Sequence, residues 1–383
     1  MIRDAEILAG LIDGIRRFVN ERLLPIEAEV ADHDEIPDEV VAEMRRLGLF
    51  GLTIPEEFGG IGLTMEEEVL VAFEIGQASP CFRSLIGTNN GIGSLGLVLD
   101  GTEAQKREWL PRLASGEVIA CFALTEPDSG SDAASLRTSA RLDGHWILNG
   151  TKRFITNAPE AGLFTVFART RPDVKGAGGI SAFLVSSDTP GLIVGKPDRK
   201  MGQRGAHTAD VILEDCRVPP TGLLGREGEG FRTAMRVLDR GRIHIAAVCV
   251  GLSERLIREA VGYATARRQF GQPIAEFQLI QAMLADSRAE AYAARCMVVE
   301  TARARDAGED VSERASCCKL FASEALGRIA DRAVQVHGGA GYMQDYAVER
   351  LYRDARLYRI YEGTSQIQQL VIARKMLSGF SRG

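Results

Sequence analysis

The spacing of apolar residues changes twice along the chain. Up to about residue 117 the apolar positions recur every three or four residues, as in Leu8, Leu11 and Ile15. From there to about residue 228 they alternate, and after that the longer period returns. A period near 3.6 is typical of helices and a period of two is typical of strands. The pattern therefore predicts a helical domain at 1–117, a β domain at 118–228 and a second helical domain at 229–383.

The first helical domain contains two segments of contrasting composition. Residues 64–78 have the pattern of an amphipathic helix. Residues 84–99 are rich in glycine and other small residues, which predicts a helix or a broken helix. Because each glycine lowers the stability of a helix by up to about 1 kcal/mol, the glycines of this segment require an explanation. Two explanations remain open: close packing against another helix, or room for a thin substrate chain.

Short strand-like runs fill the middle domain. They are separated by clusters of Gly, Pro and Asp and lie at residues 145–149, 163–168, 180–185 and 210–213. No helical patterns alternate with them, so a doubly wound dinucleotide-binding fold is not indicated. The pattern predicts a small β domain of the barrel type. The glycine-rich stretch 225–230 lacks the strand-to-helix context of a phosphate-binding loop, and we interpret it as a hinge.

Long periodic segments dominate the last domain. Four of them have a helical pattern and short connections, at residues 235–255, 258–266, 279–306 and 313–336. Such a series predicts a four-helix bundle. The chain is therefore expected to be mainly α, with one central β domain.

A lone carboxylate lies between two periodic segments near the C-terminus. Glu362 and Gly363 belong to the connection between them. Ser365, followed three residues later by Gln368, resembles a capping box, which predicts a helix that begins at about Ser365. The free N–H groups of such a helix end attract anions such as a pyrophosphate. Glu362 is therefore a candidate general base, and a solvated surface turn is the alternative.

Composition narrows the class of protein. The formal net charge is −6 and the pI is about 5.6, with Lys and Arg interspersed among acids, so nucleic acid is not an expected partner. Seven cysteines without CxxC pairs predict reduced thiols in a cytosolic setting, with neither disulfides nor structural zinc. The N-terminal segment is amphipathic and dotted with acids, which indicates neither a signal peptide nor a membrane span. We expect a cytoplasmic protein without a metal site.

Five motifs, in order along the chain, are similar to those of the acyl-CoA dehydrogenase family. They are PEEFGGIG at residues 55–62, ALTEPDSGSD at 123–132, RRQFGQPIAEFQ at 267–278, QVHGGAGY at 335–342 and IYEGTSQIQ at 360–368. Together they extend over more than 300 residues, which is too much agreement for chance. The resemblance implies the family's fold, an α-helical domain, a small β-barrel domain and a four-helix bundle. It also implies an FAD enzyme that oxidises acyl-CoA thioesters to 2-enoyl-CoA.

In this family the last motif carries the catalytic glutamate. The resemblance implies that Glu362 abstracts the α-proton while flavin N5 accepts the β-hydride. It also implies that the Glu362 N–H group and a ribityl hydroxyl of the flavin bind the thioester oxygen and stabilise the enolate-like transition state. Electrons are then expected to pass to an electron-transferring flavoprotein. The expected assembly is a homotetramer, a dimer of dimers.

The resemblance also assigns residues to FAD. Those expected near the isoalloxazine ring and its adjoining loop are Phe122, Leu124, Thr125, Ser131, Phe154 and Thr156. The family usually has Trp where this chain has Phe154, so ring stacking is kept and the indole N–H donor is lost.

A second group is expected to reach the FAD of a neighbouring subunit. It consists of Arg267, Phe270 and Gln278, joined from the same side by Gln335, Gly338 and Gly339; Thr364 and Gln366 are also assigned to the cofactor. An arginine suits the pyrophosphate, whereas the alternative for Arg267 is a solvated helix face. His337, inside the glycine motif, is interpreted as a packing or hydrogen-bonding residue, because no second ligand lies at a metal spacing.

Substrate residues are assigned in the same way. Ser131 matches a position at the flavin or the pantetheine arm, and Gly363 is assigned to the substrate as well. Asp239, Arg242 and Arg374 match positions near CoA or the catalytic glutamate.

Arg83 precedes the glycine-rich segment, and Phe-Arg-Ser at this point is similar to Tyr-Arg-Ser in the glutaryl-CoA dehydrogenase branch. There the arginine holds the distal carboxylate of the substrate. The alternatives are an arginine that caps a helix end or one that pairs with an acid such as Glu74. The expected substrate is a short- or medium-chain acyl-CoA, with or without an ω-carboxylate.

Other functions share parts of this pattern. An acyl-CoA oxidase would keep the fold and the base and would let oxygen reach the reduced flavin, but such enzymes usually carry an additional C-terminal domain, which is not expected in a chain that ends at Gly383. A flavin-dependent monooxygenase or a nitroalkane-oxidising relative would lack the glutamate at 362. A non-catalytic CoA-binding or assembly protein should have lost the base or the flavin residues, and none is lost here.

Overall fold

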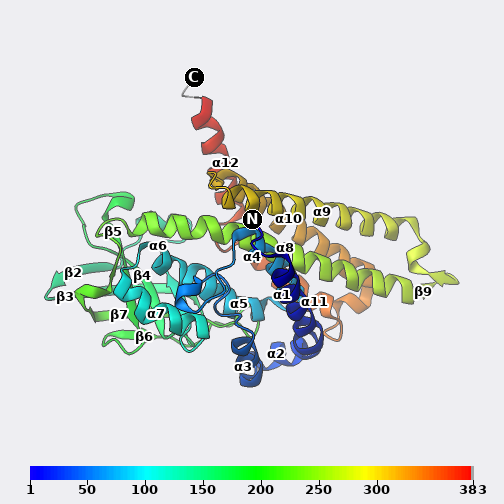
Figure 1. The fold of residues 1–383 in the computed structure, drawn as a ribbon. Coiled ribbons are helices and arrows are strands. Elements are labelled where there is room, and N and C mark those ends of the chain that lie inside the picture. Colours follow the sequence, from blue (N-terminus) through cyan, green and yellow to red (C-terminus); the bar gives the residue numbers. More distant parts are fainter. Residues whose placement is uncertain (381–383) are drawn as a thin grey trace.

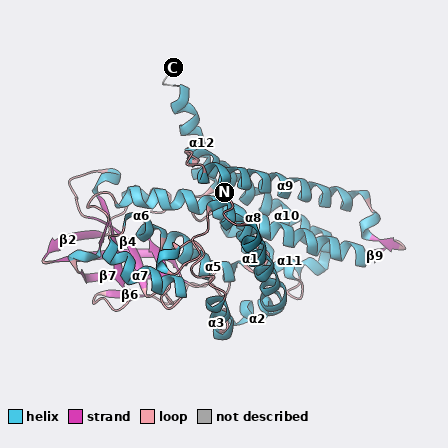
Figure 2. Ribbon diagram, in the orientation of Figure 1, coloured by secondary structure: helices cyan, strands magenta, loops and turns pink. Residues whose placement is uncertain are grey.

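The three parts predicted from the apolar period are present in the computed structural model, which describes residues 1–380 of the chain (Figure 1). The strands of the large sheet gather at one end of the molecule, and long helices extend from them to the other end, where β9 (Arg268–Gln269) lies (Figure 2). No helix within residues 1–380 is long and apolar enough to cross a membrane.

The N-terminal part is helical throughout. Its helices are α1 (Ala5–Phe18), α2 (Glu27–His33), α3 (Asp38–Arg46), α4 (Met65–Ile75), α5 (Pro80–Thr88), α6 (Leu95–Asp100) and α7 (Glu103–Ser115). Side chains cap three of them: Asp4 accepts hydrogen bonds at the start of α1, and Thr64 and Thr102 form capping boxes at α4 and α7. These caps satisfy N–H groups that have no partner within the helix.

Helix α4 differs from the amphipathic helix predicted at 64–78. Nearly all of it is buried, including the consecutive Glu66, Glu67 and Glu68. Each carboxylate is paired with an arginine far away in sequence: Arg303 with Glu66, Arg3 with Glu67 and Arg240 with Glu68. The predicted helix is present, but its acidic residues do not form an exposed polar face, because buried carboxylates are tolerated where guanidinium groups compensate them.

The glycine-rich segment is a broken helix, as predicted. A π-helical turn, Asn89–Gly93, separates α5 from α6. Asn89 donates hydrogen bonds to two backbone carbonyls of neighbouring segments, which anchors the break. A Cβ at Gly93 would lie 2.9 Å from the Cβ of Ala120, so close packing accounts for this glycine.

The middle part is one eight-stranded sheet. Its strands are β1 (Ala120–Ala123), β2 (Ser139–Asp143), β3 (His145–Thr156), β4 (Leu163–Arg169), β5 (Ile180–Ser186), β6 (Leu192–Val194), β7 (Thr208–Val218) and β8 (Leu223–Leu224). The order is β6-β7-β3-β2-β4-β5-β8, and β1 pairs with β4 in parallel. The four predicted runs fall in β3, β4, β5 and β7. The shorter strands were not predicted, because two to five residues carry too little periodicity.

The C-terminal part is built on α8 (Gly230–Ala266), a single helix of 37 residues. The other helices are α9 (Gln278–Asp306), α10 (Ser312–His337), α11 (Ala347–Ala355) and α12 (Ser365–Phe380), and a short β9–β10 hairpin (Arg268–Gln269, Gln272–Pro273) follows α8. The prediction of two helices at 235–255 and 258–266 was wrong, because Leu256 and Ile257 are buried and continue the helix.

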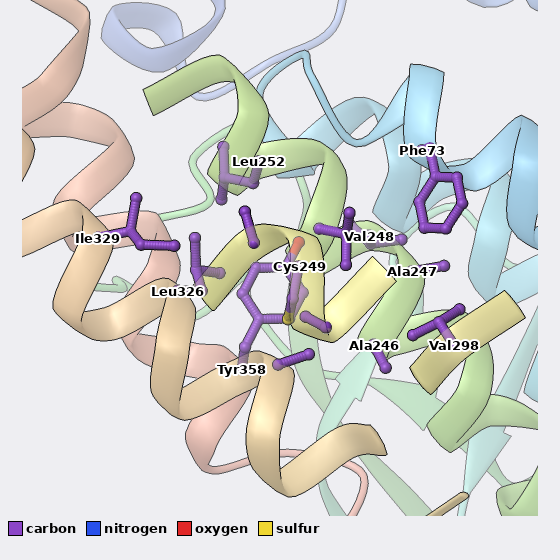
Figure 3. Close-up of a cluster of buried hydrophobic side chains, with 14 of the residues drawn as sticks. Phe73, Ala246, Ala247, Val248, Cys249, Leu252, Val298, Leu326, Ile329 and Tyr358 are labelled. Atoms are coloured by element: carbon purple, nitrogen blue, oxygen red, sulfur yellow. The ribbon is translucent and has the colours of Figure 1, made fainter. Parts of the chain in front are cut away.

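Helix α8 connects all parts of the molecule. It contacts α6 and β5 near its start, α4 in the middle, and α9, α10 and α11 in the bundle. Figure 3 shows the core of the bundle, where Cys249 and Leu252 of α8 meet Leu326 and Ile329 of α10. Burying each such large apolar side chain stabilises the fold by about 1.5–3 kcal/mol. Helix α12 leaves this body and projects outward (Figure 1).

Candidate active site

A cavity of about 720 Å³ lies where the three parts meet. Its walls are formed by α5, by β1 and the turn after it, by β3, by α8, and by α12 with the loop that precedes it. The predicted site residues that line it are Arg83, Phe122, Leu124, Thr125, Ser131, Phe154, Thr156, Arg242, Glu362, Gly363 and Arg374. The fold therefore brings together one group of the predicted residues, drawn from all three parts.

Glu362 lies on the wall of this cavity in an unusual backbone conformation. Its φ is +52° and that of Gly363 is +90°, so two consecutive residues are left-handed. Such a conformation is strained for a residue with a Cβ. Its Oε2 atom is buried and has no hydrogen-bond partner among the described residues. A Cβ at Gly241 of α8 would lie 2.4 Å from this oxygen, so the carboxylate is packed against a helical position where the absence of a side chain leaves room for it.

The loop that carries Glu362 is held by its backbone carbonyls. Lys319 of α10 donates to the Gly363 carbonyl at 2.7 Å, and Gln368 of α12 donates to the carbonyls of Gly363 at 3.0 Å and Glu362 at 3.3 Å. These bonds come from two helices, so the strained turn is fixed from both sides.

The start of α12 confirms one prediction and corrects another. The helix begins at Ser365, as expected. The capping side chain is Thr364, whose Oγ1 accepts from the Ile367 N–H group at 3.2 Å, while the Ser365 hydroxyl donates to Glu324. The predicted Ser365–Gln368 capping box is wrong, because tertiary contacts with Glu324 and with the loop carbonyls occupy both side chains.

The predicted flavin residues of β1 and β3 lie on one wall. Phe154 is 60% exposed with a φ of +58°, and the Arg153 guanidinium lies 4.9 Å from its ring. Behind this wall the buried Lys152 donates to the Leu124 carbonyl at 3.2 Å and to Glu126 at 2.7 Å. Burial lowers the pKa of Lys152 to about 8, although Glu126 opposes the change. The pair fixes the strand end that faces the cavity.

A second group of predicted residues lies elsewhere. Arg267, Phe270, Gln278, Gln335, Gly338 and Gly339 are all exposed, and none of them lines the cavity. They surround the β9–β10 hairpin and the C-terminal end of α10, at the opposite end of the bundle from the strands (Figure 1). Within one chain, the two groups of predicted cofactor residues do not meet.

The remaining predicted residues have mostly local contacts. Asp239 lies outside the cavity lining and pairs with Arg242 at 2.7 Å. Thr364 caps α12, and Gln366 is exposed on it. His337 is buried, its Nδ1 lies 2.8 Å from the Ala333 carbonyl oxygen, and its ring stacks on Tyr263 at 4.2 Å. The packing role predicted for His337 agrees with these contacts.

Arg83 is 5% exposed and lines the cavity, and its partner is not the acid named from the sequence. Glu74 pairs with Arg16 at 2.9 Å, so pairing with Arg83 is contradicted. The Arg83 Nε–H donates to His244 Nε2 at 3.0 Å, and His244 Nδ1 lies 2.8 Å from Glu68 Oε1. The two terminal nitrogens of Arg83 bond to no other described residue.

This arrangement defines the protonation state of His244. An imidazole that accepts from Arg83 must carry its proton on Nδ1, where it donates to Glu68. Burial and the neighbouring Arg83 lower the pKa of His244. Burial alone would raise the pKa of Glu68, but Arg240 and His244 lower it to about 2. The guanidinium of Arg83 is thus held by a neutral imidazole, and no carboxylate of the described residues pairs with it.

Several residues that support the site were not predicted from the sequence. They lie within helices whose apolar pattern they do not disturb, and they are Gly241, His244, Glu68 and Lys319. A charged residue within a helix is normally expected to face solvent, and only the structure shows that it is buried. Gln368 was predicted to complete a capping box, whereas it binds the carbonyls of the Glu362 loop.

A helical, β and helical fold encloses a shared cavity with an unpaired carboxylate on its wall, which is an arrangement suited to an enzyme that removes a proton from a bound substrate. Three domain models account for nearly the whole chain: the N-terminal domain of acyl-CoA dehydrogenase matches residues 9–117, the middle domain residues 121–216 and the C-terminal domain residues 228–377. The chain belongs to the acyl-CoA dehydrogenase family.

Individual relatives agree over their full length. The chain is 43% identical over 366 residues to an acyl-CoA dehydrogenase of Bacillus subtilis (strain 168), covering 95% of this chain and 96% of the relative. Its fold is similar to that of butyryl-CoA dehydrogenase from Megasphaera elsdenii, with a TM-score of 0.94, 34% identity and coverage of 98% and 100%. It is also similar to glutaryl-CoA dehydrogenase in its glutaryl-CoA complex, with a TM-score of 0.93, 32% identity and coverage of 99% and 97%.

Proposed function

We propose that this enzyme oxidises an acyl-CoA thioester to the trans-2-enoyl-CoA with FAD, and that Glu362 is the base that removes the α-proton. The observation that carries the assignment is the buried Oε2 of Glu362, which faces the cavity wall without a protein partner. A carboxylate that is not committed to an ion pair is free to accept a proton from a substrate placed beside it.

The residues present fit FAD. Phe122 and Phe154 offer apolar surface for a flavin ring, and Thr125, Ser131 and Thr156 offer hydroxyl groups on the same cavity. Bound FAD would supply the acceptor for the hydride that leaves carbon β. The role of this chain is to place the thioester between that wall and Glu362.

The exposed second group supports an assembly in which one subunit completes the site of another. Arg267 and Phe270 lie too far from the cavity of their own chain to serve it, and Phe270 is 94% exposed with a φ of +49°. A large aromatic side chain in so exposed and strained a position is typical of an interface. We propose a homotetramer in which this group contacts the FAD of a neighbouring subunit.

Proton removal next to a thioester is uphill for a carboxylate in water, and each pKa unit of mismatch costs about 1.4 kcal/mol. The cavity reduces this cost by orientation and by excluding water, since the loop that holds Glu362 is fixed before substrate arrives. The proposed substrate contacts are Ser131, Gly363, Asp239, Arg242 and Arg374, which lie on or beside the same cavity. Arg242 and Arg374 supply positive charge suited to the phosphates of CoA.

Arg83 indicates the chemistry of the acyl tail. Its terminal nitrogens are free at the cavity, near a tyrosine, Tyr361, whose hydroxyl is also buried without a partner. A buried guanidinium is costly unless it meets an anion or a hydrogen-bond acceptor. We propose a short- or medium-chain substrate that ends in a carboxylate, and the relative whose complex contains glutaryl-CoA has the same fold.

The electron acceptor is proposed to be an electron-transferring flavoprotein, as is usual in this family. Rapid turnover with oxygen alone would identify an oxidase instead. A protein that binds acyl-CoA and FAD but shows no flavin reduction under anaerobic conditions would be a non-catalytic member.

The decisive experiment is anaerobic flavin reduction by acyl-CoA in wild type and in Glu362→Gln. The amide keeps the shape and loses the base, so FAD content is expected to be unchanged while reduction is lost. Glu227→Gln, an exposed residue outside the cavity lining, is the matched control. Reduction by Glu362→Gln within about tenfold of wild type, which is about 1.4 kcal/mol of barrier, would place the base elsewhere.

A further inference from the structure

Lys319 is a buried cation without a carboxylate partner. It lies on α10 with 0% exposure and forms no ion pair with any residue that the structure describes. Its ammonium group donates to the Gly363 carbonyl at 2.7 Å. Burying an ammonium group without a counter-ion is unfavourable for the free energy of folding, because the charge loses its hydration. A leucine or methionine would fill the same space without this cost.

Glu362 is one of several titratable groups near Lys319, and none of them forms an ion pair with it among the described residues. Cys249 and Arg242 of α8, Glu324 of α10 and Glu362 of the loop are the titratable groups that act on it. The Cys249 thiol is neutral, because burial raises its pKa to about 12. Glu324 already binds Arg359 and the Ser365 hydroxyl.

The contact falls directly after two consecutive residues with a left-handed backbone. The Gly363 carbonyl directly follows the two left-handed residues, Glu362 and Gly363. Gln368 donates to the same carbonyl, but Gln368 is neutral and belongs to the helix that the loop itself starts. Lys319 therefore ties the loop to a separate, fully packed helix of the bundle, and burial lowers its pKa to about 8, so most of its charge is retained at neutral pH.

We propose that Lys319 is a positioning residue of this enzyme: its ammonium group holds the Glu362 loop by the Gly363 carbonyl and thereby fixes where the Glu362 carboxylate lies. The proposal rests on the proposed role of Glu362 as the base. It requires no contact between Lys319 and substrate or FAD.

The test compares Lys319→Met with Ser316→Ala in the holoenzyme. Ser316 is one turn away on α10, is 0% exposed and bonds within the helix, so its loss perturbs the same helix without touching the loop. The measurements are FAD content, the rate of anaerobic flavin reduction at saturating butyryl-CoA or glutaryl-CoA, and the half-saturating substrate concentration.

For Lys319→Met we expect FAD content and half-saturation close to wild type, and a reduction rate lower by about tenfold or more. The rate should fall without a matching change in half-saturation, because the base is misplaced while the substrate contacts remain. Ser316→Ala should keep the wild-type rate and half-saturation. A Lys319→Met enzyme whose reduction rate is within about twofold of wild type overturns the proposal, whatever its melting temperature.

Two further variants keep the outcome interpretable. If Lys319→Met binds no FAD, Lys319→Gln is measured in its place, since it retains a hydrogen-bond donor and loses the charge, and a slower flavin reduction at unchanged half-saturation is again expected. Loss of FAD in both variants overturns the proposal, because Lys319 would then serve the stability of the fold. Glu362→Gln is measured in parallel: an active Glu362→Gln rejects the proposed base, whereas an inactive Glu362→Gln beside an unaltered Lys319→Met rejects only the role of Lys319.

Discussion

Gly241 of α8 faces the carboxylate of Glu362 so closely that a Cβ at position 241 would lie 2.4 Å from Oε2. Glycine is unfavourable in the middle of a long helix by about 1 kcal/mol relative to alanine. Its presence at this position leaves the space that the carboxylate occupies, although the two residues are far apart in the sequence.

Gly241→Ala should separate activity from stability. The added methyl group displaces the Glu362 carboxylate, so we expect anaerobic flavin reduction to slow by about tenfold or more, equal to about 1.4 kcal/mol of barrier. The melting temperature should stay the same or rise, because alanine favours the helix. Gly262→Ala is the control, since a Cβ at this position of α8 meets nothing within 4 Å. Wild-type rates in Gly241→Ala would show that the carboxylate has another position available.

Arg83→Met should change substrate preference. The variant keeps the stem of the side chain and loses the charge that faces the cavity. We expect kcat/KM for glutaryl-CoA to fall by roughly 2–4 kcal/mol, as when a buried ion pair loses one partner, and that for butyryl-CoA to change much less. Butyryl-CoA thus serves as the internal control. Equal losses for both thioesters, or no preference of the wild type for glutaryl-CoA, would assign Arg83 to structure.

Arg267→Ala should reduce FAD content and oligomer stability together. Arg267 is exposed at the end of α8 and is proposed to serve the cofactor of a neighbouring subunit. The adjacent Arg268, which donates to the Gly271 carbonyl, provides the control variant Arg268→Ala. Subunit mass in solution, FAD absorbance and melting temperature check the outcome. An apo tetramer with unchanged melting temperature would contradict the shared site.

Asp354→Asn should alter the pH dependence of stability. Asp354 is buried and accepts from the Gln203 N–H group, while its Oδ2 has no partner among the described residues. Burial raises its pKa to about 6, although the Gln203 N–H and Arg350 oppose the change. The folded state therefore binds this proton more tightly than the unfolded state does.

The sign of the effect follows from that difference. The contribution of Asp354 to the free energy of unfolding is full below the unfolded pKa of about 3.9 and is lost as the pH rises through about 6. Asparagine cannot ionise, so the stability of Asp354→Asn relative to wild type should increase from pH 4 to pH 7 in denaturant titrations. A constant difference between the two proteins would show that Asp354 does not titrate in this range.

The order of the domains and the identity of the family could be read from the sequence alone. The apolar period reports which face of a local segment is buried, so its two changes predicted the helical, β and helical order. The motif around Glu362 placed the candidate base because all of its residues are contiguous. The start of α12 at Ser365 was predicted for the same reason.

The contacts that position the site were decided only by the tertiary structure. Nothing in the local pattern of Glu66, Glu67 and Glu68 indicates burial, and the arginines that pair with them lie far away in the sequence. Lys319 lies 44 positions before the Gly363 carbonyl that it binds, and nothing in its local pattern distinguishes it from a surface lysine. Sequence periodicity records neighbours along one element, whereas the partner of a buried charge is selected by the packing of several elements, so these contacts could be found only in the folded chain.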